Sequence, residues 1–340
     1  MRKAISNNLL LAVSFVVLTV LAVLLVHGFT DMALVLLACF CVLFAVDVIV
    51  FWPSGKIKAK WMRGVVTGFL ILLNLVVCLS VSIGQVATAL WFSPCQDTDA
   101  YHTLSSLSNM REVTIRDGGR TYSGWFVKNA EGKAPLVLFF GGNGDCAAQI
   151  CASFQKSAYW DTYAGYNFMM VDYPGYGLSG GSPSESSIFQ MTLAAYDYAV
   201  TRDDVDGAKI VVEGYSLGTG AATYLASRRS VSGLILIAPF DQALSMYNAA
   251  LPIFYGPFQW LASIHFNSMA YAQSVSVHPL VITSTSDEYI NYRLSEHLAE
   301  FFPEKPEFHL LSGLHHNDYL GGDATGVRQL VSAYLQEALQ

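Results

Sequence analysis

The chain has 340 residues, of which 53% are hydrophobic and 13% are charged, whereas soluble domains usually carry about 25% charged residues. The first 92 residues are the most apolar and hold 6 of the 19 basic and 2 of the 26 acidic residues, so the rest has a net charge of −11. An acidic domain repels phosphates, and we therefore expect no binding to nucleic acids.

Three apolar runs in the first 92 residues are long enough to cross a bilayer, which takes about 20 residues. They span residues 9–26, 32–52 and 65–92. A cleaved signal peptide is an alternative for the first run, but no small-residue cleavage site follows it. The other two runs are too long and too uniformly apolar for buried core helices. We predict three transmembrane helices and a membrane region, 1–92, that contacts the lipid bilayer through residues 9–92.

Basic residues predict the orientation of these helices, because cytoplasmic loops carry an excess of Lys and Arg. Arg2 and Lys3 precede the first run, four more lie in the loop between the second and third runs, and loop 28–31 has none. Three crossings then place the rest of the chain on the non-cytoplasmic side, which is periplasmic or extracellular in a bacterium and lumenal or extracellular in a eukaryote.

Three cysteines of the extramembrane chain would face an oxidising compartment, where one disulfide can form. They are Cys95, Cys146 and Cys151. Residues five apart on a helix point to different faces, which disfavours a bond between Cys146 and Cys151. The pairing stays open.

The pattern after residue 92 predicts a polar linker, 93–110, followed by an α/β domain, 111–340. Segments 112–116 and 121–127 form a predicted hairpin, because Asp117-Gly118-Gly119 is a turn sequence. Further strands are expected at 136–140, 168–171, 209–213, 234–238, 280–285 and 308–311, and helices at 184–200, 221–226 and 325–340. Strands that alternate with helices indicate a mostly parallel central sheet flanked by helices.

An aromatic segment, 240–277, is predicted as a short lid-like insert. Two interpretations stay open. The aromatic side chains could roof the site and suit an acyl chain, or they could be the ordinary packing surface of helices on a sheet.

A G-x-S-x-G sequence, 214–218, joins the strand 209–213 to the helix that follows. Such a turn forces its central residue into a strained conformation, and the glycines remove Cβ atoms that would clash. We predict Ser216 as a nucleophile beside a helix N-terminus, whose partial positive charge favours an oxyanion. A glycine-rich turn with an ordinary serine is the alternative.

A glycine cluster, 141–145, follows the strand 136–140 and leaves backbone N–H groups unshielded. In a hydrolase this loop supplies one donor of the oxyanion hole, for which we predict the N–H of Asn143. The N–H of Leu217, next to the nucleophile, is the other predicted donor. A plain strand-to-helix loop is the alternative.

Asp287 and His316 each follow a predicted strand, as Ser216 does, and ligands bind at this edge of parallel sheets. Singly, each would be an ordinary loop residue. Together they supply what a serine nucleophile needs: an imidazole to take its proton and a carboxylate to hold the imidazole tautomer. The three residues predict a catalytic triad that uses no metal and no organic cofactor.

These motifs resemble those of the α/β-hydrolase superfamily over about two-thirds of the chain, from about residue 111 to the end. The matching segments are the Asp287 region, FFGGNGD (139–145), DYPGYGLSGGSPSE (172–185), GYSLGTG (214–220) and HHND (315–318). The resemblance is greatest to a membrane-anchored group with long-chain acyl ester or thioester substrates. It implies that His316 rather than His315 is the base. Gly141 and Pro174 replace a His and an Arg usual in that group, but neither belongs to the triad.

We therefore predict a membrane-anchored serine hydrolase that cleaves carboxylic esters or thioesters, with acyl or lipid-type substrates, through an acyl-enzyme on Ser216. An amidase or peptidase with the same triad is one alternative, and a catalytically idle membrane scaffold is another. A transporter is disfavoured, because there are few predicted spans and they offer few polar side chains for a substrate, chiefly Asp47 and Asn74.

Overall fold

The computed structural model describes residues 91–157, 159–250, 264–322 and 324–339, with residues 65, 68, 252, 254–256, 259 and 262. The chain divides into two compact units, Met1–Leu90 and Trp91–Gln340. In the described part of the chain, no helix is long and apolar enough to cross a membrane. The runs predicted as transmembrane helices lie almost wholly outside the described residues, as does Asp47.

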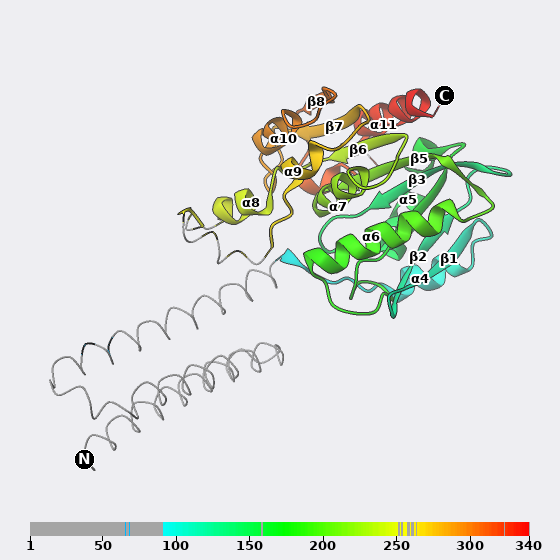
Figure 1. Cartoon of the computed structure of the whole chain (residues 1–340). Helices are drawn as coiled ribbons and strands as arrows, with labels where there is room; N and C mark the ends of the chain where they lie inside the picture. The colour runs from blue at the N-terminus through cyan, green and yellow to red at the C-terminus, as the bar shows by residue number, and fades with distance from the viewer. Residues whose placement is uncertain are drawn as a thin grey trace, which may run out of the picture. The chain divides into compact units, whose positions relative to one another are not determined.

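An eight-stranded sheet with the order β1-β2-β4-β3-β5-β6-β7-β8 forms the centre of the unit Trp91–Gln340 (Figure 1). Its strands are β1 (Met110–Asp117), β2 (Arg120–Val127), β3 (Ala134–Phe140), β4 (Asn167–Val171), β5 (Val205–Tyr215), β6 (Gly233–Ile237), β7 (Pro279–Ser284) and β8 (Glu307–Leu311). The pairs that join β4, β3, β5, β6, β7 and β8 are all parallel. β2 runs in the opposite direction and pairs antiparallel with β1 and β4. The predicted, mostly parallel sheet is confirmed.

The predicted hairpin is the β1–β2 pair, in which Asp117 is directly opposite Arg120. Its two turn residues, Gly118 and Gly119, have φ angles of +54° and +79°. Two positive φ angles in succession are what a two-residue turn needs to follow the twist of the strands, and glycine adopts them without strain.

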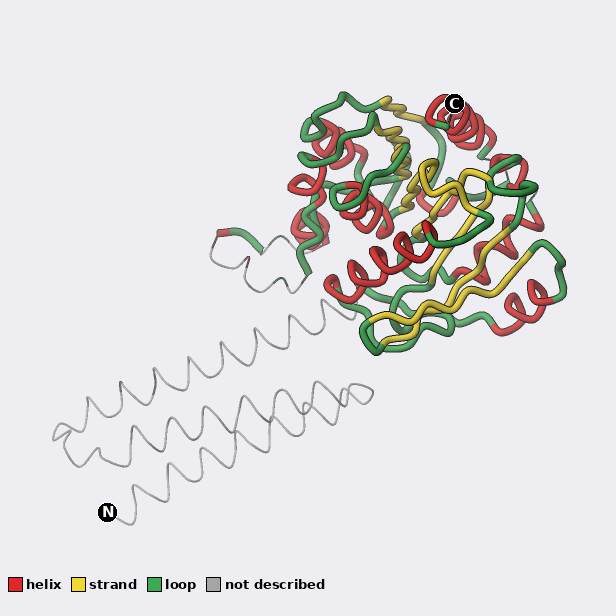
Figure 2. Tube along the Cα trace, turned by 45° about the vertical axis from the view of Figure 1, so that its right-hand side comes forward, coloured by secondary structure: helices red, strands yellow, loops and turns green. Residues whose placement is uncertain are grey.

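Helices cover both faces of the sheet, as Figure 2 shows with helices in red on either side of the yellow strands. One face carries α4 (Thr98–Ser105), α5 (Ala147–Lys156), the 3-10 helix η2 (Tyr159–Tyr163) and α11 (Thr325–Ala338). The other carries α6 (Glu185–Val200), α7 (Leu217–Ala226), α9 (Ser268–Ala272) and α10 (Tyr292–Ala299). Because the sheet is covered on both sides, its middle strands are mostly apolar runs rather than alternating patterns.

Two helix starts show how local sequence shapes the fold. Ser184 caps α6 and exchanges hydrogen bonds with Ser187 in a capping box, so the helix expected from residue 184 begins one residue later, at Glu185. The helix expected from residue 221 begins at Leu217, because the chain turns directly from β5 into α7 at Ser216. The alanine-rich part of the segment indicated the helix but not its first turn.

Part of the predicted linker 93–110 is helical. Asp97 caps α4 by accepting a hydrogen bond from the N–H of Ala100, and Ala100 and Leu104 are buried against the domain. The segment therefore packs on the sheet instead of only bridging to it.

The predicted lid-like segment contains α8 (Ala243–Ala250) and α9. Phe240 at its start and Phe266 just before α9 approach Gly220 of α7, where an added Cβ would lie 2.8 Å from the Phe266 ring. Trp91 packs on both rings, at centroid distances of 5.8 and 6.2 Å. These contacts attach the segment to the helix that follows Ser216, and they are compatible with either interpretation of its aromatic residues.

Glu213 is a carboxyl group buried inside the sheet, on β5, three residues before Ser216. The hydroxyl of Tyr163 donates to its two carboxyl oxygens at 3.1 Å. Burial raises the pKa of Glu213 to about 8 from its ordinary 4.5. The group is therefore largely protonated at neutral pH.

Replacing Glu213 by glutamine should stabilise the protein more as the pH rises. Between about pH 4.5 and 8 the folded protein holds a proton on Glu213 that the unfolded chain has lost, so the free energy of unfolding falls with rising pH. Glutamine does not titrate and still accepts from Tyr163. Melting temperatures should be similar near pH 4.5 and diverge by roughly 5–10 °C near pH 8, a difference of a few kcal/mol. Replacing the exposed Glu300 by glutamine is the control, and a pH-independent difference would contradict the expectation.

Candidate active site

Ser216 lies in a sharp turn between β5 and α7, with φ 52° and ψ −117°. A Cβ on Gly214 would lie 2.5 Å from the carbonyl oxygen of Gly218, and a Cβ on Gly218 would lie 2.0 Å from that of Phe140. Both distances are far too short for a real side chain, so the turn requires glycine on each side. Its geometry is that of a nucleophile elbow, in which strain exposes the serine hydroxyl above the sheet.

The structure brings Ser216, His316 and Asp287 together, although they lie up to 100 residues apart in the sequence. The Nε2 atom of His316 is 2.8 Å from Ser216 Oγ, and its Nδ1 atom is 2.8 Å from Asp287 Oδ2. Each residue follows the carboxyl end of a strand, namely β5, β8 and β7. All three residues are largely buried, with exposed fractions of 8–9%.

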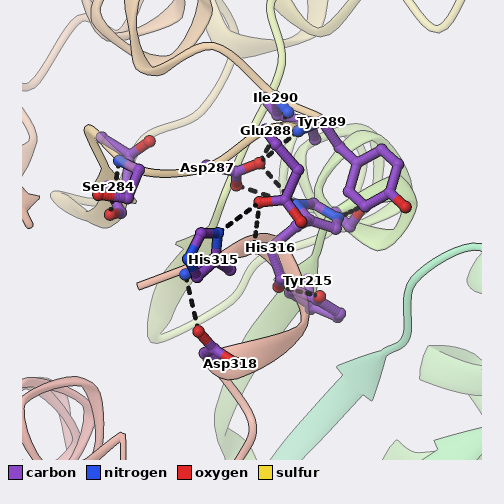
Figure 3. Close-up of polar contacts among 12 residues, drawn as sticks. Tyr215, Ser284, Asp287, Glu288, Tyr289, Ile290, His315, His316 and Asp318 are labelled. Atoms are coloured by element: carbon purple, nitrogen blue, oxygen red, sulfur yellow. Dashed lines mark hydrogen bonds and ion pairs between the residues drawn. The ribbon is translucent and has the colours of Figure 1, made fainter. Parts of the chain in front are cut away.

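The carboxylate of Asp287 is held by the loop that carries it (Figure 3). Its Oδ1 atom accepts hydrogen bonds from the backbone N–H groups of Tyr289 and Ile290, at 3.0 and 2.8 Å. Burial alone would raise the pKa of Asp287, but these bonds and the bond from His316 outweigh it and hold the pKa below its ordinary value. Asp287 is therefore ionised at neutral pH, so Nδ1 of His316 donates to it and Nε2 is left to accept from Ser216.

The imidazole of His316 is positioned by Tyr215 and Glu288. The hydroxyl of Tyr215 donates to the backbone carbonyl of His316 at 2.6 Å, and the two rings stack with centroids 5.4 Å apart. Glu288 Oε2 accepts from the backbone N–H of His316 at 3.2 Å and contacts His315 Nδ1 at 3.2 Å (Figure 3). The histidine next to Ser216 is thus His316, while His315 is exposed and contacts Glu288.

Glu288 and Tyr215 were not assigned a role from the sequence. Glu288 directly follows Asp287, and Tyr215 directly precedes Ser216. Their position beside a predicted site residue was the only sign of a role that the sequence offered. Their contacts with His316 could not be derived from the sequence, because His316 lies about 28 residues from Glu288 and 101 residues from Tyr215.

Replacing Glu288 by alanine should lower kcat for the predicted ester hydrolysis about tenfold with little change in KM, because misplacing the predicted base, His316, by about 1 Å would cost up to about 100-fold. Glutamine at this position should restore most of the rate, since its amide oxygen can still accept from the N–H of His316. Steady-state kinetics on both variants checks this. Equal losses for alanine and glutamine would mean that the charge of Glu288, not its hydrogen bond to the backbone, is what matters.

The loop that carries Asn143 lies against residues on both sides of Ser216, Tyr215 before it and Gly218 after it. A Cβ on Gly142 would lie 3.1 Å from the ring of Tyr215, and the tight approach of Gly218 to Phe140 brings the end of β3 to the start of α7. Leu217 is the first residue of α7 and is buried. The loop and the helix start therefore meet at the turn that presents the Ser216 hydroxyl.

Tyrosines of the segment 172–181 hold this loop in place. The hydroxyl of Tyr173 donates to the carbonyl of Gly141 at 2.8 Å, and that of Tyr176 donates to Asn143 Oδ1 at 3.1 Å. Asn143 Oδ1 also accepts from the backbone N–H of Ser93 at 2.8 Å. The side chain of Asn143 is thus engaged in fixing the loop, which leaves its backbone N–H as the group that could serve a substrate. No role was predicted for these tyrosines from the sequence.

No group of three or more His, Cys, Asp or Glu side chains among the described residues could hold a metal ion. The arrangement that is present is a hydrogen-bonded chain from carboxylate to imidazole to hydroxyl. Such a chain can remove the proton of Ser216 when the hydroxyl attacks a carbonyl carbon, and can stabilise the imidazolium that forms.

Comparison with known proteins gives a family model and several relatives. The model of the alpha/beta hydrolase fold matches residues 134–266. The chain is 31% identical over 209 residues to an uncharacterized protein of Mycobacterium tuberculosis. This match covers 61% of this chain and 71% of that protein. It is 31% identical over 193 residues to alpha/beta hydrolase domain-containing protein 17C of Xenopus tropicalis, covering 57% of this chain and 59% of that protein.

A solved structure of the Pyrococcus furiosus esterase Pf2001 has a similar fold. It superimposes with a TM-score of 0.56 at 17% sequence identity, and the match covers 73% of this chain and 99% of the esterase. At this identity the likeness is one of fold.

Proposed function

The chain belongs to the α/β-hydrolase superfamily, and from this premise we propose that it is a serine hydrolase of carboxylic esters or thioesters. The observation that carries the proposal is the unbroken hydrogen-bonded chain from Asp287 through His316 to Ser216. The strained turn supports a catalytic role for Ser216. Its φ angle is positive, which costs conformational energy for a residue other than glycine, and such strain is often found at functional sites.

In the proposed reaction, His316 Nε2 takes the proton of Ser216 as its oxygen attacks the substrate carbonyl. The N–H groups of Leu217 and Asn143 donate to the oxyanion, which also lies at the N-terminus of α7. His316 then gives the proton to the leaving alcohol or thiol, and an acyl-enzyme remains on Ser216. Water, activated by the same imidazole, releases the acid and restores the enzyme.

The proposed substrates are acyl or lipid-type esters or thioesters. The resemblance to membrane-anchored acyl hydrolases supports this class. The name of the solved relative, an esterase, supports ester rather than amide cleavage.

Labelling with a fluorophosphonate probe tests the proposal directly. The purified full chain in detergent should be labelled once, and mass spectrometry of the digest should locate the adduct on Ser216. A panel of p-nitrophenyl and thioester substrates of increasing acyl length should then show turnover. Absence of both labelling and turnover would favour an idle scaffold, whereas labelling with turnover of amides alone would favour an amidase or peptidase.

We also propose that residues 9–92 anchor the protein in a membrane, with the hydrolase domain on the non-cytoplasmic side. The three apolar runs and the basic residues that flank them support this orientation. A reporter enzyme that is active only outside the cytoplasm, fused after residue 340, should be active. Activity of a cytoplasm-specific reporter at the same position would contradict it.

A further inference from the structure

Two thiols that play no part in the proposed reaction lie next to each other. Cys95 Sγ and Cys146 Sγ are 2.9 Å apart, although the residues are 51 positions apart in the chain. We propose that Cys95 and Cys146 form a disulfide that fastens the segment after the N-terminal unit to the start of α5. The sequence left the cysteine pairing open, and this geometry selects one pair.

The surroundings of the pair suit such a bond. Cys146 is the cap residue of α5, with an extended backbone and an exposed fraction of 1%. Cys95 is partly exposed, and its thiol also contacts Gln149 Oε1 at 3.3 Å. A disulfide is about 2.05 Å long, so the sulfurs need to approach by roughly 1 Å. The third cysteine of the described residues, Cys151, is fully buried on α5 and serves as the natural control.

The bond would clamp a segment that touches two loops of the site. The N–H of Ser93 donates to Asn143 Oδ1 and to the hydroxyl of Tyr176, and the carbonyl of Cys95 accepts from the N–H of Gly177 at 2.7 Å. Residues 93–95 therefore lie between the Asn143 loop and the segment 172–181. A covalent link at Cys95 would hold this contact closed and restrict the movement of the Asn143 loop.

Formation of the bond is a thiol–disulfide exchange with a disulfide as the oxidant, either glutathione disulfide or the oxidised form of a thiol oxidoreductase. The Cys95 thiolate attacks one sulfur of the oxidant, which releases one thiol and leaves a mixed disulfide. The Cys146 thiolate then attacks the Cys95 sulfur and releases the second thiol, so two electrons pass to the oxidant and two protons leave the protein cysteines. Burial raises the pKa of the Cys146 thiol, so Cys95, which is also more exposed, meets the oxidant first.

The test uses the purified full chain in detergent, equilibrated with glutathione disulfide and then alkylated without reduction. Mass spectrometry of the digest should show a Cys95–Cys146 linked peptide in the wild type and in Cys151→Ser, and none in Cys95→Ser. Reduction should lower the melting temperature of the wild type by about 5–15 °C and leave that of Cys95→Ser unchanged. Alkylation of both cysteines in the wild type, or a bond from Cys95 to another cysteine, would overturn the proposal.

These readouts do not require turnover. A chain that forms the bond but hydrolyses no ester would contradict the proposed function alone, and a chain that hydrolyses esters with both thiols alkylated would contradict the bond alone.

Discussion

Replacing Ser216 by alanine should lower kcat for a short p-nitrophenyl ester by about 10⁴- to 10⁶-fold, to the level left by binding and oxyanion stabilisation. Alanine removes the oxygen that His316 Nε2 contacts at 2.8 Å, so no acyl-enzyme can form. KM should change little, because the side chain that is lost makes a bond to substrate only during the reaction.

The control for this variant is alanine at Ser276, an exposed serine before β7. Ser276→Ala should keep wild-type kinetics and fluorophosphonate labelling, while Ser216→Ala loses both. The melting temperature of Ser216→Ala should stay within a few degrees of the wild type, since the Cβ and the strained backbone remain. Full esterase activity in Ser216→Ala would remove Ser216 from the mechanism.

Most strands of the domain could be predicted because each is a short apolar run with its own local signal. The runs 136–140, 168–171 and 234–238 correspond to β3, β4 and β6 within about two residues. The order of the strands could not be read in the same way, because β4 is inserted between β2 and β3. That order depends on which strands pair across long loops, and periodicity along the chain carries no information about it.

The site, like the sheet, has residues that a local sequence signal identifies and residues that only long-range contacts identify. Ser216, Asp287 and His316 could be proposed because each follows a recognisable strand, and ends of parallel strands share one edge of a sheet. The groups that position His316 and the Asn143 loop could not, because Glu288, Tyr173 and Tyr176 act through contacts with residues at least 28 positions away. The short strand before His316, β8, was predicted, but the single 3-10 turn (His316–Asp318) that orients the imidazole was not.

Replacing Asp287 by asparagine should lower kcat about 10⁴-fold at neutral pH, as the same exchange does in another triad of this kind. The reason lies in the hydrogen bonds of the two carboxyl oxygens. Oδ1 accepts from the N–H groups of Tyr289 and Ile290 and lies 3.0 Å from His316 Nδ1, whereas Oδ2 is the oxygen nearer to Nδ1, at 2.8 Å. The asparagine oxygen must therefore stay with the two N–H groups, and its NH₂ group must face Nδ1.

An NH₂ group facing Nδ1 requires that this nitrogen accept, which moves the imidazole proton to Nε2. Nε2 then donates toward Ser216 and can no longer take its proton. The fold should be unaffected, because the asparagine keeps the contacts with Tyr289 and Ile290. Nitrogen NMR of His316 should report a proton on Nδ1 in the wild type and on Nε2 in Asp287→Asn.

The matched control is Asp203→Asn, an exposed aspartate in the turn before β5, at the end of that strand opposite to Ser216. It should keep wild-type kcat. If Asp287→Asn retained more than about a tenth of the wild-type rate while NMR showed the proton on Nε2, the tautomer would not limit catalysis. His316 would then need no carboxylate partner, and the role proposed for Asp287 would be wrong.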